Sequence, residues 1–124
     1  MSHQITWESR GSIIECSGLF DIGELQEANG ILHGHEGFDR HTYQIWDLLN
    51  ADMSTISEED MLEPSAMDDA ASMSTPRMKI ALVVNDDYAV KLCESYSKSI
   101  GEFNSKWECR LFDSMGDARQ WARS

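Results

Sequence analysis

The order of apolar and polar positions along the chain predicts alternating strands and helices. The longest aliphatic run, residues 80–84, is rich in β-branched side chains and predicts a central strand buried on both faces. Asp86 and Asp87 follow this strand, and one of them is expected to cap the next helix. A buried strand leading directly into a helix is typical of an α/β domain with a parallel sheet.

Three further strands are predicted before this run or at the start of the chain. Alternating residues 5–7 and the mostly apolar segment 12–17 flank the turn signal Arg10-Gly11, which predicts an antiparallel hairpin. Residues 42–48 predict an internal strand that ends in a carboxylate-rich region. The chain therefore supplies both antiparallel and parallel strands to one mixed sheet.

Capping residues indicate where the first and last helices begin. Asp21, with Glu24 three residues later, predicts the start of one helix, and Gly34 its end. Its buried face is expected to contain Ile22, Leu25, Ala28 and Leu32. Residues 107–112 predict the last strand, and Ser114 is expected to cap the final helix. The residues of this helix that close onto the sheet are expected to be Met115, Ala118 and Trp121.

The segment 42–75 contains eight acidic residues and no Lys or Arg. Ser57 is expected to cap a helix there, with acidic residues in the first turn, namely Glu58, Glu59 and Asp60. Pro64 either kinks this helix or separates it from a new helix over residues 65–73. The expected buried stripe is Leu62, Ala66, Ala70 and Met73, flanked by Met67 and Ala71.

Residues 89–103 show the clearest amphipathic pattern. The apolar positions are Ala89, Leu92, Cys93, Tyr96, Ile100 and Phe103, and the polar face carries Lys91, Glu94, Lys98 and Glu102. The tryptophans are expected in the core, at Trp7, Trp46, Trp107 and Trp121. Together the elements predict a single α/β domain over residues 1–124, with a mixed four- to five-stranded sheet flanked by about four helices.

Charge and composition narrow the class of function. The 22 acidic and 10 basic residues give a formal net charge of -12, which disfavours nucleic-acid and anionic-membrane partners. No apolar run approaches the roughly 20 residues of a membrane span, and no signal-peptide pattern is present. A cytoplasmic protein is expected. The three cysteines show no CxxC spacing and are expected to be buried and reduced, at Cys16, Cys93 and Cys109.

Two groups of side chains are candidate metal sites. His33, His35 and His41, with Glu36 and Asp39, could ligate zinc, but the glycines among them indicate a surface connection. Carboxylates at adjacent strand ends could instead hold Mg²⁺ for phosphoryl transfer, the candidates being Asp47, Asp86 and Asp87. Helix capping explains the presence of Asp86 and Asp87 without a metal. No cofactor is expected.

Several stretches resemble one family. They are Gly18-Leu19-Phe20-Asp21, Ile45-Trp46-Asp47-Leu48 with Ile56-Ser57, residues 79–83 and Asp117-Ala118-Arg119-Gln120-Trp121. With the order of elements, they make nearly the whole chain similar to a STAS domain (sulfate transporter and anti-sigma factor antagonist), in the stand-alone SpoIIAA-like branch. That resemblance implies a regulatory module that acts through protein–protein contacts.

The same resemblance implies a phosphorylated serine at the start of the second helix, in an Asp-Ser-Ser-Gly sequence. Here the corresponding positions are Ser57-Glu58-Glu59-Asp60, so the phosphoacceptor position is a glutamate and Ser57 is expected to cap the helix. We therefore expect no phosphoserine switch.

The sequence thus predicts a non-enzymatic regulatory or protein-interaction module with a protein partner or a second copy of itself. Its binding surface is expected at Ser57, Glu58, Glu59 and Asp60. The resemblance to stand-alone relatives also implies the first alternative, a carrier or sensor of small apolar ligands or lipids. Its local support is the methionine-rich region with Met53, Met61, Met67 and Met73, and its expected dry cavity is lined by Leu62, Met67 and Met73. The second alternative is a Mg-dependent phosphoryl-transfer enzyme that uses the strand-end carboxylates.

Overall fold

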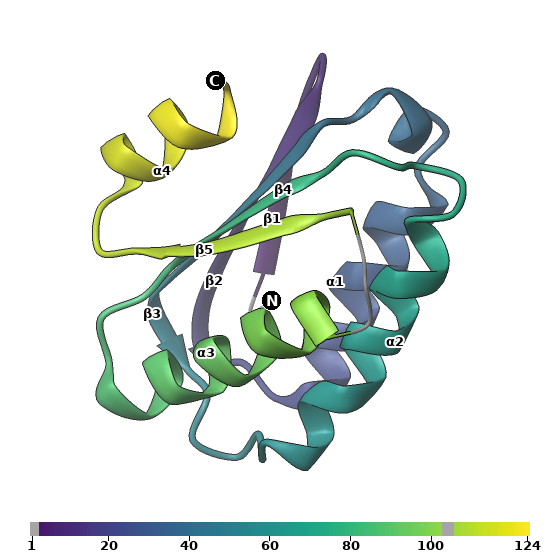
Figure 1. The fold of residues 1–124 in the computed structure, drawn as a ribbon. Helices are drawn as coiled ribbons and strands as arrows, with labels where there is room; N and C mark the ends of the chain where they lie inside the picture. The colour runs from purple at the N-terminus through teal and green to yellow at the C-terminus, as the bar shows by residue number, and fades with distance from the viewer. Residues whose placement is uncertain (1–2, 103–105) are drawn as a thin grey trace.

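The computed structural model describes residues 3–102 and 106–124 (Figure 1). Its single sheet has the strand order β1-β2-β3-β4-β5. The strands are β1 (His3–Glu8), β2 (Gly11–Leu19), β3 (Tyr43–Asp52), β4 (Lys79–Val83) and β5 (Glu108–Phe112). The helices are α1 (Ile22–Gly34), α2 (Leu62–Ala71), α3 (Asp87–Glu102) and α4 (Met115–Ala122), with short 3-10 turns η1 (Phe38–Arg40) and η2 (Glu59–Met61). The predicted α/β fold with a mixed sheet is confirmed.

The sheet combines one antiparallel hairpin with a parallel succession of strands. β1 pairs antiparallel with β2, and every later neighbour pairs in parallel. The predicted central strand is β4, which lies between β3 and β5, so β3 and not β4 is the middle strand. β4 is nevertheless buried on both faces, as its uninterrupted aliphatic sequence predicts.

Helices cover both faces of the sheet. α1, α2 and α3 lie on one face and α4 lies on the other (Figure 1). Because side chains alternate along a strand, Ile45 of β3 contributes to the smaller core under α4, whereas Trp46 contributes to the larger core under the other three helices. The smaller core also contains Ala118 and Ala122, with Met115 and Trp121 packed against it. The expected closure of α4 onto the sheet is confirmed.

The helix caps form as their sequences predict. Asp21 Oδ1 accepts a hydrogen bond from the backbone N–H of Glu24 at 2.9 Å. Asp86 Oδ2 accepts from Ala89 N at 3.0 Å, and Ser114 Oγ accepts from the N–H of Asp117 at 3.2 Å. Each bond satisfies a backbone donor that the first helical turn leaves without a partner. Of the two candidate caps after β4, Asp86 therefore serves α3.

The buried face of α3 agrees with its amphipathic pattern. The five buried residues are Ala89, Leu92, Cys93, Tyr96 and Ile100, whereas the expected sixth, Phe103, lies outside the described residues. Among the tryptophans, Trp46 and Trp107 are buried and Trp121 is partly so, but Trp7 is 38% exposed and its assignment to the core is wrong. Trp7 lies on the edge strand β1, and its ring stacks on His35 instead of entering the core.

The prediction for α2 is wrong about which face is buried. Leu62 is 53% exposed and Met73 is 85% exposed, and Met73 lies beyond the end of the helix. Ala66 and Ala70 are exposed as well. The buried residues are Met61, Pro64, Ser65 and Asp68, which follow the same helical spacing shifted by about one position.

Two features explain why the buried face of α2 is rotated by about one residue from the predicted face. Asp68 is a polar residue that points into the core because its carboxylate finds hydrogen-bond donors there. Pro64 lies in the first turn of α2, where a missing backbone N–H costs nothing, so it neither kinks the helix nor separates two helices. A prediction from hydropathy assigns aspartate and proline to the exposed face, so it chose the wrong set of residues as the buried face of α2.

Within the described ranges, no helix has both the length and the apolar character needed to span a bilayer.

Candidate functional site

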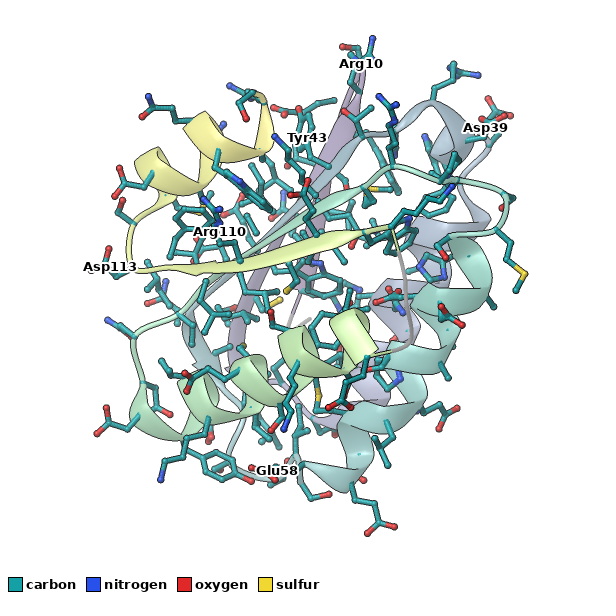
Figure 2. The ribbon with its side chains drawn as sticks, viewed as in Figure 1. Arg10, Asp39, Tyr43, Glu58, Arg110 and Asp113 are labelled. Atoms are coloured by element: carbon teal, nitrogen blue, oxygen red, sulfur yellow. The ribbon has the colours of Figure 1, made fainter. Side chains whose placement is uncertain are left out.

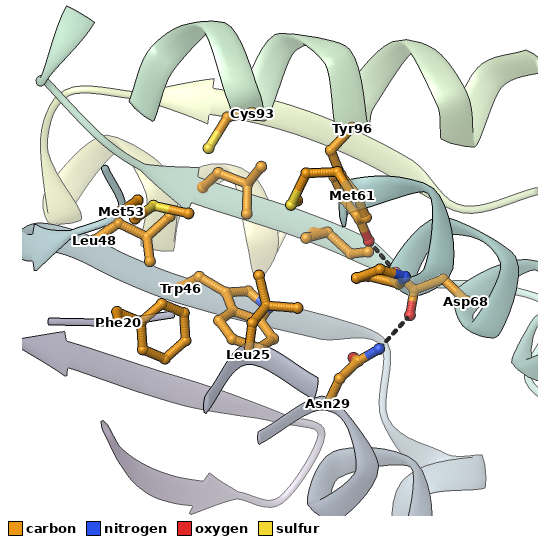
Figure 3. A pocket seen from close by; sticks show the side chains of 13 residues that line it. Phe20, Leu25, Asn29, Trp46, Leu48, Met53, Met61, Asp68, Cys93 and Tyr96 are labelled. Atoms are coloured by element: carbon orange, nitrogen blue, oxygen red, sulfur yellow. Dashed lines mark hydrogen bonds between the residues drawn. The ribbon is translucent and has the colours of Figure 1, made fainter. Parts of the chain in front are cut away.

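A small apolar cavity lies within the larger core, between the sheet and the helices α1, α2 and α3 (Figure 3). Its volume is about 40 Å³. The lining side chains are Phe20, Leu25, Asn29, Trp46, Leu48, Met53, Met61, Pro64, Asp68, Ile80, Leu82, Cys93 and Tyr96. The expected lining residues Leu62, Met67 and Met73 are absent from this wall, because α2 is turned by about one residue relative to the prediction. The cavity exists, but the sequence placed it on the wrong side of the helix.

A buried polar network closes one end of this cavity. Asp68 is 2% exposed; its Oδ1 accepts a hydrogen bond from Asn29 Nδ2 at 3.3 Å, and its Oδ2 accepts one from the hydroxyl of Tyr96 (Figure 3). His33 Nε2 lies 3.1 Å from the same Oδ1 without the alignment of a hydrogen bond. Burial, followed by the nearby Asp68 charge, raises the pKa of Tyr96 well above its usual value, so its hydroxyl stays a donor. The network joins α1, α2 and α3.

The geometry of the cavity limits what it can bind. Sites for drug-sized ligands usually measure ~300–1,000 Å³. The present volume of about 40 Å³ is enough only for very small molecules. Met53 and Met61 line it, and their unbranched side chains can rearrange more easily than branched ones. A larger apolar ligand would require these side chains to move.

The acidic segment before α2 forms a separate surface. Ser57 Oγ accepts a hydrogen bond from the N–H of Asp60 at 3.1 Å, and Asp60 Oδ2 accepts from the N–H of Ser57 at 2.9 Å. This reciprocal pair is the capping arrangement expected for Ser57. Ser57 and Asp60 therefore stabilise the turn, while the carboxylates of Glu58 and Glu59 face solvent.

We use the name acidic surface for the exposed residues Glu58, Glu59, Leu62 and Glu63. Among residues 3–102 and 106–124, none of these three glutamates forms an ion pair. The hydroxyl of Tyr88, at the start of α3, donates a hydrogen bond to the Ile56 carbonyl. This bond holds in place the loop that leads into the acidic surface. Met67 and Met73 lie farther along the chain and complete neither this surface nor the cavity wall.

The carboxylates of the second alternative, the magnesium site, do not come together in the described residues. β3 continues to Asp52, so Asp47 lies within the strand and not at its end, and its Oδ1 accepts from Leu49 N at 3.2 Å. Asp47 lines a hollow with residues of β1 and β2, whereas Asp86 is engaged in capping α3. The sequence underestimated the length of β3 because its polar residues after Leu48 still form ladder hydrogen bonds with β2.

Two of the three histidines stay together, because the rings of His35 and His41 stack with 5.4 Å between their centroids. His33 faces Asp68, whereas the ring of His35 stacks on Trp7 with 3.8 Å between centroids. His41 lies in the expected connection before β3, but it is 5% exposed, so its expected place on the surface is wrong. In the part of the chain that the structure describes, no three His, Cys, Asp or Glu side chains are arranged to hold a metal ion.

The overall architecture matches solved structures. A structure described as the anti-sigma factor antagonist SpoIIAA in its unphosphorylated form superposes with a TM-score of 0.65, covering 98% of this chain and 96% of that one. The chain has a SpoIIAA-like fold. SpoIIAA from Bacillus in the phosphorylated form gives a TM-score of 0.61, over 96% of this chain and 97% of that one. An uncharacterised Shewanella loihica protein with a SpoIIAA-like fold gives 0.59, over 97% and 91%.

Sequence identity to these three proteins is only 10%, 12% and 11%, in the order given, so the likeness establishes the fold alone. No protein-family model matches the sequence, and no curated protein is detectably similar to it. The resemblance expected from the sequence is therefore confirmed at the level of the fold. What the module binds has to be argued from the site itself.

Proposed function

We propose that the chain is a non-enzymatic regulatory module that binds a protein partner through the acidic surface. The observation that carries this proposal is Leu62, a large apolar side chain that is 53% exposed on a surface with Glu58, Glu59 and Glu63. In the proposed complex Leu62 forms the desolvated centre and the glutamates form the polar rim that selects the partner. A SpoIIAA-like fold supports it, because SpoIIAA is described as an anti-sigma factor antagonist.

The charge on this surface defines the chemistry of the partner. Three unpaired glutamates favour a basic surface, and a net charge of -12 accelerates the approach of a basic partner at low salt. Leu62 then requires an apolar pocket or side chain among the partner's basic residues. Binding should weaken as the salt concentration rises.

The proposed interaction works without a phosphoserine switch. Two of the similar structures are SpoIIAA in unphosphorylated and phosphorylated forms. In this chain Ser57 accepts the capping hydrogen bond from Asp60 N, and the next two residues already carry negative charge. A phosphate on Ser57 would add charge of the sign that is already present.

The test compares two double variants of equal net charge. E58Q/E63Q removes two charges from the acidic surface, and E36Q/E94Q removes two exposed charges elsewhere. A partner obtained by affinity capture is purified, and its dissociation constant is measured for each variant by calorimetry. We expect E58Q/E63Q and L62S each to weaken binding about tenfold, and E36Q/E94Q to change it by less than about twofold.

Equal effects of the two double variants would show that only bulk charge matters and would overturn the proposal. Sedimentation of the chain alone, before and after the L62S change, shows whether the partner is a second copy. If the wild type sediments as a dimer and L62S as a monomer, the acidic surface is the contact between the two copies.

The apolar cavity favours a second candidate function, the carriage of a small apolar ligand. Its wall is almost entirely apolar, and the Asn29–Asp68 pair supplies a single polar anchor. Native mass spectrometry after incubation with short aliphatic alcohols tests this role, with L25W as the variant that fills the cavity. A ligand retained by the wild type and lost in L25W supports the carrier, whereas no retained ligand under gentle conditions contradicts it.

A further inference from the structure

The basic residues of this acidic chain gather at one end of the sheet. Six of its 10 Lys and Arg residues line three adjoining hollows there: Arg10, Arg40, Arg77, Lys79, Lys106 and Arg123. The amino ends of the parallel strands lie at this end of the sheet, whereas the acidic surface lies beyond their carboxyl ends. Figure 2 shows Arg10 and Glu58 at opposite ends of the molecule. The same hollows are lined by the carboxylates of Glu8, Asp39 and Glu108, so positive side chains outnumber negative ones at this end of an otherwise acidic chain.

Three arginines share one of these hollows because of the sheet topology. Arg10 immediately precedes β2, Arg40 comes shortly before β3, and Arg77 shortly before β4. Since these three strands are parallel neighbours, the segments that lead into them lie side by side. The hollow, which we name the arginine pocket, is lined by Ser9, Arg10, Asp39, Arg40, His41, Thr42, Thr75, Pro76 and Arg77. Its volume of about 420 Å³ lies within the range of small-ligand sites.

The positive charges of the arginine pocket are not neutralised by the chain. Across the described residues, none of its three guanidinium groups forms an ion pair. Arg123 shows the contrast, because its Nη2 donates to both carboxylate oxygens of Glu8 at 2.9 Å. Among the described residues of the lining, Asp39 is the one acidic residue, so three positive charges face one negative charge there.

His41 adds a buried polar group to the same wall. The residue is 5% exposed, and no hydrogen bond joins its ring nitrogens, which keep contact with solvent, to another described residue. The neighbouring Thr75 Oγ1 is buried without a hydrogen-bond partner among the described residues. Its ring is held in place by stacking, with centroids 5.4 Å from His35 and 6.0 Å from Trp7. Burial, with a smaller effect from the charges of His35 and Arg40, lowers the pKa of His41, so the neutral ring offers one N–H donor at pH 7.

The backbone beneath the pocket is fixed by hydrogen bonds between its walls. Thr42 donates from its N–H and from its hydroxyl to the Arg10 carbonyl, at 2.6 and 3.3 Å. Lys79 N donates to the Thr42 carbonyl at 2.9 Å, and Trp107 Nε1 donates to the Thr75 carbonyl at 2.7 Å. The segments that carry the arginines are thus tied to one another before any ligand binds, which lowers the entropic cost of binding.

We propose that the arginine pocket binds the phosphoryl group of a small phosphomonoester. Guanidinium groups present planar pairs of donors that match the oxygens of a phosphate, and three of them suit a dianion better than a single carboxylate. The neutral His41 N–H supplies a further donor. The rest of the molecule is strongly acidic and repels a nucleic acid or an anionic bilayer, whereas a small anion experiences mainly the charges within about 10 Å.

Calorimetric titration at low, fixed ionic strength tests the proposal with two probes, inorganic phosphate and glycerol 2-phosphate. The variants R40Q and R77Q each remove one guanidinium from the pocket, and K91Q removes one charge from the outer face of α3. All three side chains are exposed, so the fold should be unaffected, which circular dichroism checks. We expect R40Q and R77Q each to weaken binding about tenfold, and K91Q to change it by less than about twofold.

Proton NMR of the His41 ring gives a local readout. Bound phosphate should raise the pKa of His41, because a nearby anion favours the charged ring. Equal affinity for the two probes identifies a phosphate subsite, whereas tighter binding of glycerol 2-phosphate shows that the remaining wall contributes; both support the proposal. Absence of saturable binding of either probe, or equal losses in R77Q and K91Q, would overturn it. Neither result bears on the acidic surface, whose variants are at the other end of the sheet.

Discussion

Removal of the buried carboxylate of Asp68 should destabilise the fold more than any change on the exposed face of the same helix. In the D68A variant, Asn29 Nδ2 and the Tyr96 hydroxyl lose their acceptor while they remain buried. Each buried donor without a partner costs about 1–3 kcal/mol, and the lost contact with His33 adds to this. We expect a decrease of about 3–5 kcal/mol in the free energy of unfolding. For a chain of 124 residues this corresponds to roughly 12–20 °C in Tm.

Urea denaturation followed by circular dichroism measures the effect, and D69A is the matched control. Asp69 is the next residue of α2, and its carboxylate makes no hydrogen bond or ion pair among the residues described. D69A should therefore stay within about 0.5 kcal/mol of the wild type. Y96F tests the same network from α3, since it leaves Asp68 Oδ2 without its donor.

The double variant D68A/Y96F distinguishes a network from two separate contacts. If Asp68 and Tyr96 stabilise one another, the double variant should lose at least about 1 kcal/mol less than the sum of the single losses. A D68A loss below about 1 kcal/mol, or strict additivity with Y96F, would refute the view that this carboxylate holds the three helices together.

Two further predictions concern titratable groups. Burial raises the pKa of the thiols of Cys16, Cys93 and Cys109 to about 12. At pH 8 we therefore expect labelling by a thiol reagent to be slow in the folded protein and rapid in denaturant. Fast labelling of any of the three in the folded chain would contradict this. A hydrogen bond from Tyr43 and the pairing with Arg123 lower the pKa of Glu8 below its usual 4.5, so the stabilisation is present above pH 4.5 and is lost as the pH falls through the folded-state pKa. E8Q should be less stable than the wild type by about 0.5–1 kcal/mol at pH 7. Thermal denaturation should show this difference shrinking as the pH falls below 4.5, and a difference independent of pH would exclude the ionic contribution.

Local chemistry in the sequence determined most of the secondary structure. Asp21, Asp86 and Ser114 each cap a helix with a side-chain hydrogen bond over three residues, and such an interaction depends on no distant part of the chain. The aliphatic run of β4 and the amphipathic face of α3 were likewise predictable, because their periods follow directly from strand and helix geometry.

The candidate sites depended on contacts between distant residues. Asp68 is buried only because Asn29 and Tyr96, 39 and 28 residues away, supply donors, and this rotates the buried face of α2 by about one residue from the one that hydropathy predicts. As a result the cavity was expected behind Leu62 and Met73, which are exposed.

The arginine pocket was missed for the same physical reason. Arg10, Arg40 and Arg77 are far apart in a chain whose overall charge is -12, and no local pattern links them. Parallel pairing of β2, β3 and β4 brings the segments before these strands to one edge of the sheet, and the same pairing sends the acidic segment before α2 to the opposite edge. The sequence determined the number of charges and the elements between them, whereas the tertiary structure decided which charges face the same hollow.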